Sequence, residues 1–574
     1  MINITLSKDE FEHDIYALVK AFYPDDQIKV YKPEPEKNNC HSEQTKDCHP
    51  EQTKDCHPEQ TKDYHPEQTT CHSERSEESH QSGVENKKQN ENKKQDAYKQ
   101  HNAYNNQNRN ILNKSNLQNN PIKDNADTAI HLYITLEHNN IQLIASGENQ
   151  EILKKEASVP TDEKSQYRNH LKRLLYSCLT HMTGKELPWG TLTGVRPTKI
   201  AFEHLEKNMP KEEIAGYMRK QYLCSNEKID ISLQVAEREY TLLQNMDYKK
   251  GYSVYIGIPF CPSTCLYCSF TSYSLQVYGG IVEQYLQALF KEITYAGTCM
   301  TNKKLSTVYL GGGTPTTLSA DQLDRLLTHI ESNLDFSNVI EYTVEAGRPD
   351  SITIDKLKVL KEHGVTRISI NPQSMRQKTL DIIGRKHTTK EVVEAFHMAR
   401  ELGHDNINMD IIIGLPGETK DDVAYTLEEI RKLNPDSLTV HTLAIKRAAR
   451  LNLKKEDYLD MKPHDTLDSF QLTMDFAKKN NYLPYYLYRQ KNMADNLENI
   501  GYAKYGKEGI YNILIMEEKQ TILALGAGGL SKFVFYDENR IERVENVKSL
   551  KDYIERIDEM IERKRIFLLN NALL

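Results

Sequence analysis

Three cysteines, Cys261, Cys265 and Cys268, lie within eight residues in the segment IPFCPSTCLYCSF. Thiolates are good ligands for soft metal ions, so the spacing C-x3-C-x2-C indicates metal or redox chemistry. A structural zinc site needs four closed ligands, and no fourth Cys or His stands at a suitable spacing. Thioredoxin-like exchange would use the pair Cys265 and Cys268 and would leave Cys261 without a role. Neither interpretation accounts for all three cysteines.

An iron–sulfur cluster accounts for the odd number of ligands. A 4Fe–4S cluster has four irons, so three thiolates leave one iron open to bind a small molecule. Phe270 stands two residues after Cys268, where a fourth cysteine could have followed. The segment therefore predicts one 4Fe–4S cluster that Cys261, Cys265 and Cys268 ligate, with one iron open.

A run of glycines, YLGGGTPT (309–316), follows further along the chain. It is a weak match to a phosphate loop, because no Gly-Lys-Ser/Thr follows it. Three glycines at the end of a strand leave backbone N–H and C=O groups open to close approach by a ligand. We expect Gly311, Gly312 and Gly313 to contact a ligand, and an ordinary tight turn is the alternative.

Four polar residues stand at or shortly after the ends of later strand candidates: Glu345, Gln373, Arg385 and Asp410. A carboxylate can bind ribose hydroxyls, and a carboxamide can bind adenine. Each of these residues alone is more often a surface or helix-capping group. Their positions at successive strand ends favour contact with a ligand.

A framework of alternating strands and helices must position these residues. From Tyr252 onward, apolar residues alternate in six segments, and patterns with helical spacing separate these segments. Six β/α units in sequence predict parallel strands in a full or partial barrel, with the chemistry at the carboxyl ends of the strands. The strand candidates are SVYIGI (253–258), TVYLGG (307–312), IEYTVEA (340–346), RISI (367–370), INMDIII (407–413) and SLTVHTL (437–443).

The rest of the chain is expected to form two smaller parts. Residues 1–38 contain one amphipathic helix, and residues 129–147 read as two strands around the turn at Asn139-Asn140. The predicted fold class is α/β, a partial (β/α)6 barrel with a small α+β N-terminal domain and a C-terminal α+β extension. The predicted bounds are 1–38 and 126–249 for the N-terminal domain, 250–450 for the barrel, and 451–574 for a domain that covers the substrate.

The segment 39–125 is expected to be a disordered insert. In its first part Cys40, Cys48 and Cys56 recur every eight residues, each followed by a histidine. No Ile, Leu, Met, Phe or Trp occurs from Cys40 to Asn110, so this stretch cannot bury enough apolar surface to offset its chain entropy. Cys and His also suit a weak zinc or nickel site. The near-identity of the units favours repeat expansion within a surface loop instead.

The composition excludes several classes of protein. A net charge of -8 and a pI near 6.2 argue against a nucleic-acid-binding protein. The start MINITLSKDEFEHD lacks the basic and apolar regions of a signal peptide. No stretch approaches the roughly 18 apolar residues of a spanning helix. We therefore expect a cytoplasmic protein with no nucleic-acid partner and no membrane span.

Several motifs together resemble one family. The segments YxxxPFCxxxCxYC, GGGTPT, VEA, PQS, GRKHT and DIIIGLPGET are similar to those of the oxygen-independent coproporphyrinogen III oxidase family of radical SAM proteins, over about residues 128–570. LPWGTLTGVRPTK and YYLYRQKNMADNLENIGYAK (485–504) resemble its HemZ branch. Two residues depart from the best-known oxidases, because Gly257 replaces a histidine and Phe270 replaces a fourth cysteine.

The resemblance implies specific roles for residues. Cys261, Cys265 and Cys268 would ligate the cluster, and the open iron would bind the amino and carboxylate groups of S-adenosylmethionine (SAM). One-electron reduction of SAM would then give a 5′-deoxyadenosyl radical. Tyr255 and Arg489 are the expected catalytic residues. The expected SAM contacts are Tyr255, Tyr267, Gly311, Gly312, Gly313, Thr314, Glu345, Gln373, Arg385, Asp410 and Ala444.

The expected reaction is oxidative decarboxylation of coproporphyrinogen III to protoporphyrinogen IX, with an electron donor such as flavodoxin or ferredoxin. The substrate carries four propionates, so its pocket should offer cations. The candidates for this role are Arg489, Lys491, Arg196 and Lys199. A heme-binding chaperone with His441 or His387 as heme ligand is the main alternative, and a radical SAM enzyme acting on another tetrapyrrole is a third.

Overall fold

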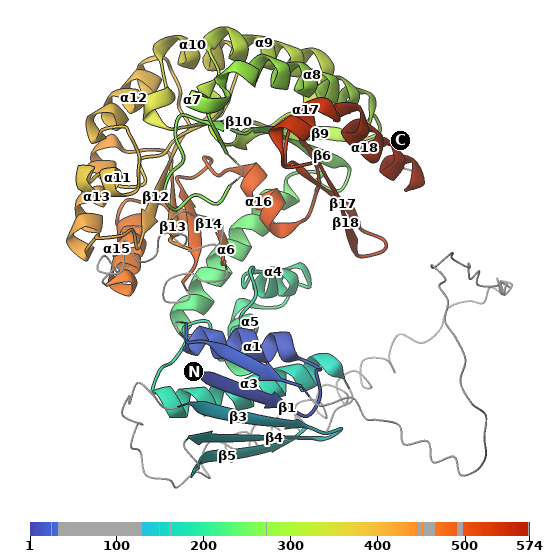
Figure 1. Ribbon diagram of the computed structural model, residues 1–574, viewed down its shortest axis with the longest axis vertical. Coiled ribbons are helices and arrows are strands. Elements are labelled where there is room, and N and C mark those ends of the chain that lie inside the picture. The colour runs from blue at the N-terminus through green and yellow to red at the C-terminus, as the bar shows by residue number, and fades with distance from the viewer. Residues whose placement is uncertain are drawn as a thin grey trace, which may run out of the picture. The chain divides into compact units, whose positions relative to one another are not determined.

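The computed structural model describes residues 1–24, 26–32, 129–147, 150–159, 163–270, 272–444, 451, 465–490, 497–571 and 573. Two large β-sheets, each with its own helices, make up this part of the chain (Figure 1). The Cys/His repeat and the rest of the insert 39–125 lie outside the described residues. Their disorder and their metal binding therefore stay predictions.

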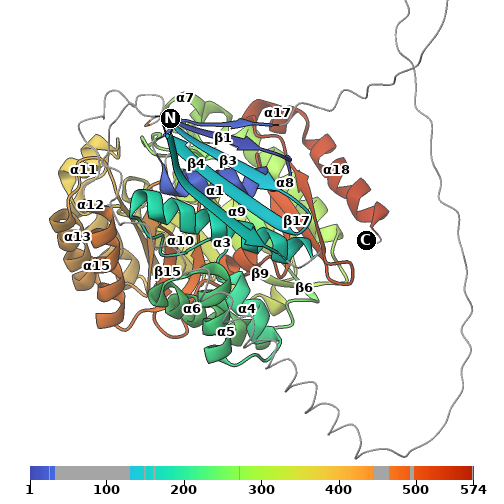
Figure 2. The same cartoon turned by 90° about the horizontal axis from the view of Figure 1, so that it is seen from below.

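The first sheet is formed by the N-terminal residues, in the strand order β2-β1-β3-β4-β5. β1 pairs in parallel with β2 and β3, whereas β3, β4 and β5 are antiparallel. Helices α1 and α3 cover one face of this sheet (Figure 2). The sheet and these helices enclose an apolar core that is distinct from the core of the second sheet. The elements are β1 (Ile2–Leu6), α1 (Glu12–Phe22), β2 (Ile28–Tyr31), β3 (Ile130–Leu136), β4 (Asn140–Gly147), β5 (Gln150–Ser158) and α3 (Lys164–Thr183).

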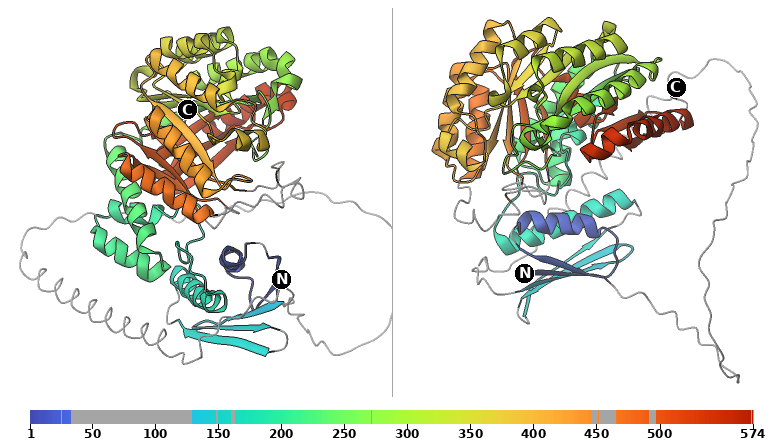
Figure 3. Two further views of the ribbon diagram at one scale, coloured as in Figure 1. Left: turned by 90° about the vertical axis from the view of Figure 1, so that its left-hand side faces the viewer. Right: turned by 45° about the horizontal axis from the view of Figure 1, so that its top comes forward.

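Six parallel strands form the centre of the second sheet, in the order β13-β12-β11-β10-β9-β6. They lie along the inner side of an arc of helices (Figures 1 and 3). All six strands predicted from the alternating pattern are confirmed. Their bounds are β6 (Gly251–Ile258), β9 (Lys304–Gly312), β10 (Glu341–Gly347), β11 (Arg367–Ile370), β12 (Ile407–Ile413) and β13 (Ser437–Thr442).

The helices between these strands bury the apolar face that their spacing predicts. Leu323, Leu326, Leu327 and Ile330 of α9, for example, are fully buried. Three helices begin at a capping box, in which the Ser or Thr side chain and the residue three positions on satisfy two free backbone N–H groups. The helices between the strands include α8 (Val282–Thr298), α9 (Ala320–Asn333), α10 (Ile354–Glu362), α11 (Gln377–Ile382), α12 (Thr389–Glu401) and α13 (Lys420–Leu433), of which α9, α12 and α13 have the capping box.

The C-terminal residues extend the large sheet at both edges. β15 pairs antiparallel with β13 and with β14, and β16 pairs in parallel with β6 before the antiparallel strands β17 and β18. The elements are α15 (Thr466–Lys479), β14 (Leu483–Tyr488), β15 (Asn499–Ala503), α16 (Ile510–Glu517), β16 (Thr521–Leu525), β17 (Leu530–Phe535), β18 (Arg540–Glu545), α17 (Leu550–Glu555) and α18 (Ile557–Asn570).

One continuous apolar core joins this sheet to the three helices that precede it: α4 (Lys199–Glu206), α5 (Lys211–Tyr222) and α6 (Asn226–Gln244). The domain boundaries expected at 249 and 450 both lie between elements that share this core. Among the helices of the described ranges, none is long and apolar enough to cross a membrane.

Candidate functional site

Five strands of the barrel each keep one partly exposed residue in their middle or carboxyl-terminal part, although their other central residues are buried. These residues are Tyr255, Tyr309, Glu345, Asp410 and His441. Neighbouring members contact one another, since the rings of Tyr255 and Tyr309 stack, Tyr309 donates to Glu345, and His441 lies 3.9 Å from Asp410. They mark an accessible inner surface at the end of the barrel where the sequence motifs lie.

The cysteine loop directly follows β6 and is tied to the glycine loop. The short strands β7 (Phe260–Cys261) and β8 (Tyr273–Ser274) pair and fix the ends of the loop. Gly313 N–H donates to the carbonyl of Ile258 and Thr314 N–H to that of Phe260, at 2.8 and 2.7 Å. The Sγ of Cys261 lies 3.7 Å from the Thr314 hydroxyl.

Gly313 is required by the contact between these two loops. A Cβ at this position would lie 2.4 Å from the carbonyl oxygen of Phe260, which is a backbone atom that cannot yield easily. Its N–H is also used within the protein. The expectation that all three glycines are open to a ligand is therefore wrong for the N–H of Gly313. Gly311 instead makes room for a carboxylate, since a Cβ there would lie 3.0 Å from Glu345.

Two arginines approach the sulfur of Cys265. Nη1 of Arg348 and Nη1 of Arg385 each lie 3.8 Å from its Sγ. Arg348 also forms an ion pair with Asp350 at 2.7 Å, and Arg385 donates to the Tyr267 hydroxyl at 3.3 Å. Guanidinium groups here offset negative charge on thiolates. Arg385 and Tyr267 were predicted, whereas Arg348 was not.

The donor set fits an iron–sulfur cluster. Three thiols stand on one loop beside two cationic side chains, and the sequence offers no fourth ligand for a closed zinc site. In the part of the chain that the structure describes, no three Cys, His, Asp or Glu side chains converge closely enough to hold a metal ion. The fit thus rests on ligand type and on the arginine contacts.

Glu345 lies among aromatic side chains at the centre of the inner surface. Its Oε1 accepts from the Tyr309 hydroxyl at 2.5 Å, and the ring of Tyr309 stacks on Tyr511 at 4.4 Å. Burial raises the pKa of Glu345 to about 7, and the nearby Asp410 adds to this rise although Tyr309 opposes it. A carboxyl group in this state can both accept and donate hydrogen bonds to a polar ligand.

Gln373 is held in a backbone conformation that is rare for a side chain of its type, with φ of 66°. Its N–H donates to the carbonyl of Asp410 and its carbonyl accepts from Ile412, both at 2.9 Å. The buried Oε1 has no hydrogen-bond partner among the described residues. A strained residue with an unused carboxamide oxygen supports the prediction that Gln373 contacts a ligand.

The structure does not bring Arg489 to this group of residues. Its guanidinium donates to the carbonyl of Leu192 at 2.6 Å, lies over the Trp189 ring, and is almost fully buried. Burial lowers the pKa of Arg489 to about 10. The guanidinium of Arg489 thus binds the loop 187–198 and has a structural role. This corrects the expectation that the side chain acts on substrate.

The other cations expected to bind propionate are also engaged or lie elsewhere. Arg196 donates to the carbonyl of Met516 and pairs with Glu518 at 2.7 Å. Lys199 pairs with Glu203 on α4, and Lys491 lies outside the described residues. Ala444 follows β13 and is half-buried.

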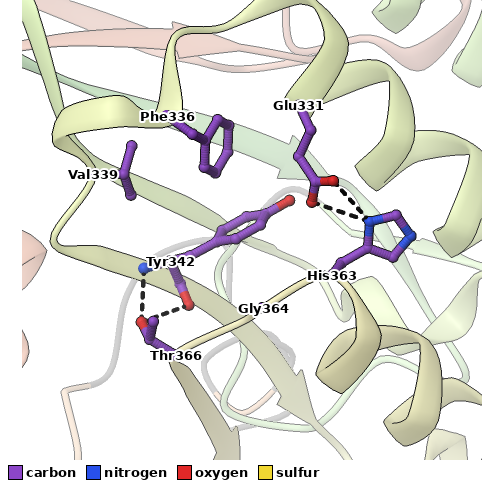
Figure 4. Close-up of a pocket in the computed structure, with 7 residues that line it drawn as sticks. All are labelled: Glu331, Phe336, Val339, Tyr342, His363, Gly364 and Thr366. Atoms are coloured by element: carbon purple, nitrogen blue, oxygen red, sulfur yellow. Dashed lines mark hydrogen bonds and ion pairs between the residues drawn. The ribbon is translucent and has the colours of Figure 1, made fainter.

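A pocket of about 390 Å³ lies near the amino ends of β10 and β11, the opposite end of the strands from the motifs. Figure 4 shows Tyr342, Glu331 and His363 around it, with Nδ1 of His363 3.0 Å from Glu331. None of the expected site residues lines it. It is not part of the candidate site.

Comparison with known proteins gives a consistent result. The family model for the radical SAM superfamily matches residues 255–430. The oxygen-independent coproporphyrinogen-III oxidase-like protein HemZ of Bacillus subtilis is 42% identical over 407 residues, which cover 70% of this chain and 81% of the relative. The heme chaperone HemW of the same organism is 32% identical, over 54% of this chain and 76% of the relative.

One oxidase is matched both among the sequences and among the solved structures. The oxygen-independent coproporphyrinogen III oxidase of Escherichia coli is 30% identical over 41% of this chain and 51% of its own. The solved structure of this oxidase, HemN, aligns with a TM-score of 0.45 and 26% identity, covering 56% of this chain and 73% of that chain.

Proposed function

Because the chain belongs to the HemZ-type branch of the coproporphyrinogen III oxidase family within the radical SAM superfamily, whose members use a 4Fe–4S cluster and SAM, we propose that it oxidatively decarboxylates coproporphyrinogen III. Each round would remove one hydrogen atom from the β-carbon of a propionate, release CO2 and pass one electron to an acceptor. A vinyl group remains, and two rounds give protoporphyrinogen IX.

The observation that carries this proposal is the meeting of the cysteine loop, the glycine loop and Glu345 at one end of the barrel. When bound, the cluster and SAM supply the one-electron chemistry that removes the hydrogen atom. Cys261, Cys265 and Cys268 would hold the cluster, with Arg348 and Arg385 offsetting the charge on Cys265.

The remaining residues would orient SAM and exclude water. Glu345, Gln373 and Asp410 present hydrogen-bonding groups to its polar ends. The stacked rings of Tyr255, Tyr309 and Tyr511 form an aromatic surface beside these three side chains, which would help to exclude water. The electron needed for SAM cleavage would come from a small carrier such as flavodoxin or ferredoxin.

The test is anaerobic incubation of the reconstituted full-length protein with SAM, a reductant and coproporphyrinogen III. We expect vinyl-bearing porphyrinogen together with 5′-deoxyadenosine. Cys268→Ser should lose the cluster and both products. Cys299→Ser is the matched control, because Cys299 is buried directly after α8, outside the cysteine loop. This variant should keep the cluster and both products.

The similarity to HemW favours heme delivery as the second candidate function. Tight heme binding by the cluster-loaded protein, with neither vinyl product nor 5′-deoxyadenosine, would support heme delivery and contradict decarboxylation. His387 is excluded as an accessible heme ligand, since it is fully buried, and burial together with Arg385 lowers its pKa to about 3. His441 keeps 29% of its side-chain surface exposed and remains a candidate for this role.

A further inference from the structure

A chain of three polar side chains crosses the ends of β12, β13 and β14. Nε2 of His441 lies 3.9 Å from Oδ2 of Asp410, and Nδ1 of His441 lies 3.5 Å from the hydroxyl of Tyr488. Asp410 is held in turn by Asn408, whose amide donates to its other oxygen at 2.7 Å. At the other end, the Tyr488 hydroxyl also contacts the side chains of Gln490 and Asn499, so both ends of the chain are held.

The strand between β13 and β14 allows this contact because it carries a glycine. A Cβ at Gly501 of β15 would lie 1.8 Å from the ring of Tyr486, so this ring occupies the place of a side chain. The ring of Tyr488 stacks parallel to that of Tyr486, with their centroids 6.2 Å apart. Tyr488 is thus oriented over β15 toward His441.

The chain faces the same inner surface as the SAM-site residues. Asp410 and His441 keep 20% and 29% of their side-chain surfaces exposed in strands that are otherwise buried. The 3.5 Å between Nδ1 of His441 and the Tyr488 hydroxyl is at the limit of a hydrogen bond, so both groups can turn toward a ligand that offers a stronger acceptor. Burial raises the pKa of Tyr488 to about 12, so its hydroxyl keeps its proton at neutral pH.

We propose that His441 and Tyr488 form the subsite that receives a carboxylate of the tetrapyrrole, with Asp410 as a positioning residue that orients His441. This inference rests on the proposed function, because it needs a propionate-bearing tetrapyrrole at the mouth of the barrel. It also supplies the donors that Arg489 and Arg196 do not supply, since both are engaged within the fold.

The test measures binding of coproporphyrin III, the aromatic and unreactive form of the substrate, to the cluster-loaded full-length protein with SAM. Tyr488→Phe and His441→Gln should each weaken coproporphyrin III binding about tenfold, the effect of one lost hydrogen bond to a charged group. The double variant should be little weaker than either single variant, because both act on one carboxylate. Binding of SAM and formation of 5′-deoxyadenosine without substrate should not change.

Tyr505→Phe is the matched control, because Tyr505 is 80% exposed and distant from the chain of three. Unchanged coproporphyrin III affinity in both variants would overturn the inference. An equal loss of SAM affinity in these variants would also overturn the inference, because His441 and Tyr488 would then act by positioning Asp410 for SAM. Because the readout is binding, this test is independent of catalysis. If the wild-type protein binds coproporphyrin III through this pair but forms no vinyl product, the proposed decarboxylation is refuted and the proposed carboxylate subsite is still supported.

Discussion

At Cys265, two guanidinium groups from different loops approach one sulfur atom. A positive charge near a cluster favours its reduced, more negative form, so loss of Arg348 should lower the reduction potential. We expect Arg348→Met to lower it by roughly 60–120 mV, since a hydrogen bond to a charged group is worth about 1.5–3 kcal/mol. An EPR-monitored redox titration of the reconstituted protein measures this shift.

Arg325→Met is the control for this prediction, because Arg325 pairs with Glu283 and Asp321 on the outer helices. The reduction potential of the cluster in the Arg325→Met protein should equal that of the wild type. An Arg348→Met protein with full iron content and an unchanged potential would show that the guanidinium does not interact with the cluster.

The residues of the candidate site were predictable where a motif marks them. The cysteines and Gln373 follow strands that the alternating pattern reveals, and Glu345 and Asp410 lie within two of these strands. Arg348 was missed because its contact with Cys265 joins positions 83 apart in the chain. Arg489 was misassigned for a similar reason, since its contact with the loop at Leu192 spans 297 positions.

At the scale of elements, the glycine loop after β9 supports the cysteine loop. Gly313→Ala should displace the carbonyl of Phe260 and destabilise the protein by about 1–3 kcal/mol, the usual cost of overpacking. Iron content after reconstitution should fall as well, because the contact lies beside Cys261. Urea unfolding and iron analysis measure both effects.

Gly194→Ala is the matched control, because nothing lies within 4 Å of a Cβ at that position. Its free energy of unfolding should stay within about 0.5 kcal/mol of the wild type. Equal behaviour of the two alanine variants would mean that the contact between the loops does not require a glycine.

Glu418 connects the loops that follow β11 and β12. It is 4% exposed and accepts from the Ser374 hydroxyl at 2.5 Å. Burial raises the pKa of Glu418 to about 7, although Ser374 opposes this rise. The folded state therefore binds a proton more tightly than the unfolded state, whose pKa is about 4.3. Stability from this group is present at low pH and is lost as the pH rises to 7.

Glu418→Gln stays neutral and should escape this loss. Relative to the wild type, its free energy of unfolding should increase by up to about 3 kcal/mol between pH 4.5 and 7.5, at about 1.4 kcal/mol per pKa unit. Urea unfolding over a series of pH values measures the difference. The exposed Glu401→Gln on α12 should show no such trend. A flat difference for Glu418→Gln would contradict the raised pKa.

The strands that were missed have weak patterns. β2 (IKVY) has only four residues, and in β5 (QEILKKEAS) charged side chains interrupt the apolar alternation. The central barrel strands are apolar over most of their length and were found within a few residues. Burial alone does not decide which strands the local pattern reveals, since β15 is buried throughout and was missed, whereas β3 and β4 each have a partly exposed face and were predicted.

At the scale of the whole molecule, long-range pairing decides how the parts join. β16 pairs with β6, and β15 pairs with β13, so the C-terminal residues complete the same sheet that carries the cysteine loop. Such pairings depend on contacts between distant segments and cannot be read from local periodicity. Residues 451–574, which were expected to form a domain that covers the substrate, therefore share the apolar core of the barrel in the described ranges.

A buried ion pair fastens this C-terminal extension to the barrel. Lys564 of α18 and Glu292 of α8 are both fully buried, with their charged atoms 2.7 Å apart. Glu292 also accepts from the N–H of Gly526 and from the hydroxyl of Tyr553, and thereby holds the turn after β16. Lys564→Met leaves the carboxylate buried without its counter-charge, and we expect a loss of about 3–5 kcal/mol in the free energy of unfolding.

The loss of unfolding free energy in the double variant Glu292→Gln with Lys564→Met should be about 1–3 kcal/mol smaller than the sum of the losses in the two single variants. The reason is that Glu292→Gln removes the carboxylate that Lys564→Met leaves without a counter-charge. Lys551→Met is the matched control, since Lys551 pairs with Glu555 on the surface of α17 and such a pair is worth about 0.3–0.5 kcal/mol. Urea unfolding of the four proteins measures the cycle. A Lys564→Met protein as stable as Lys551→Met would show that the extension is held by its strand pairing alone, without help from this pair.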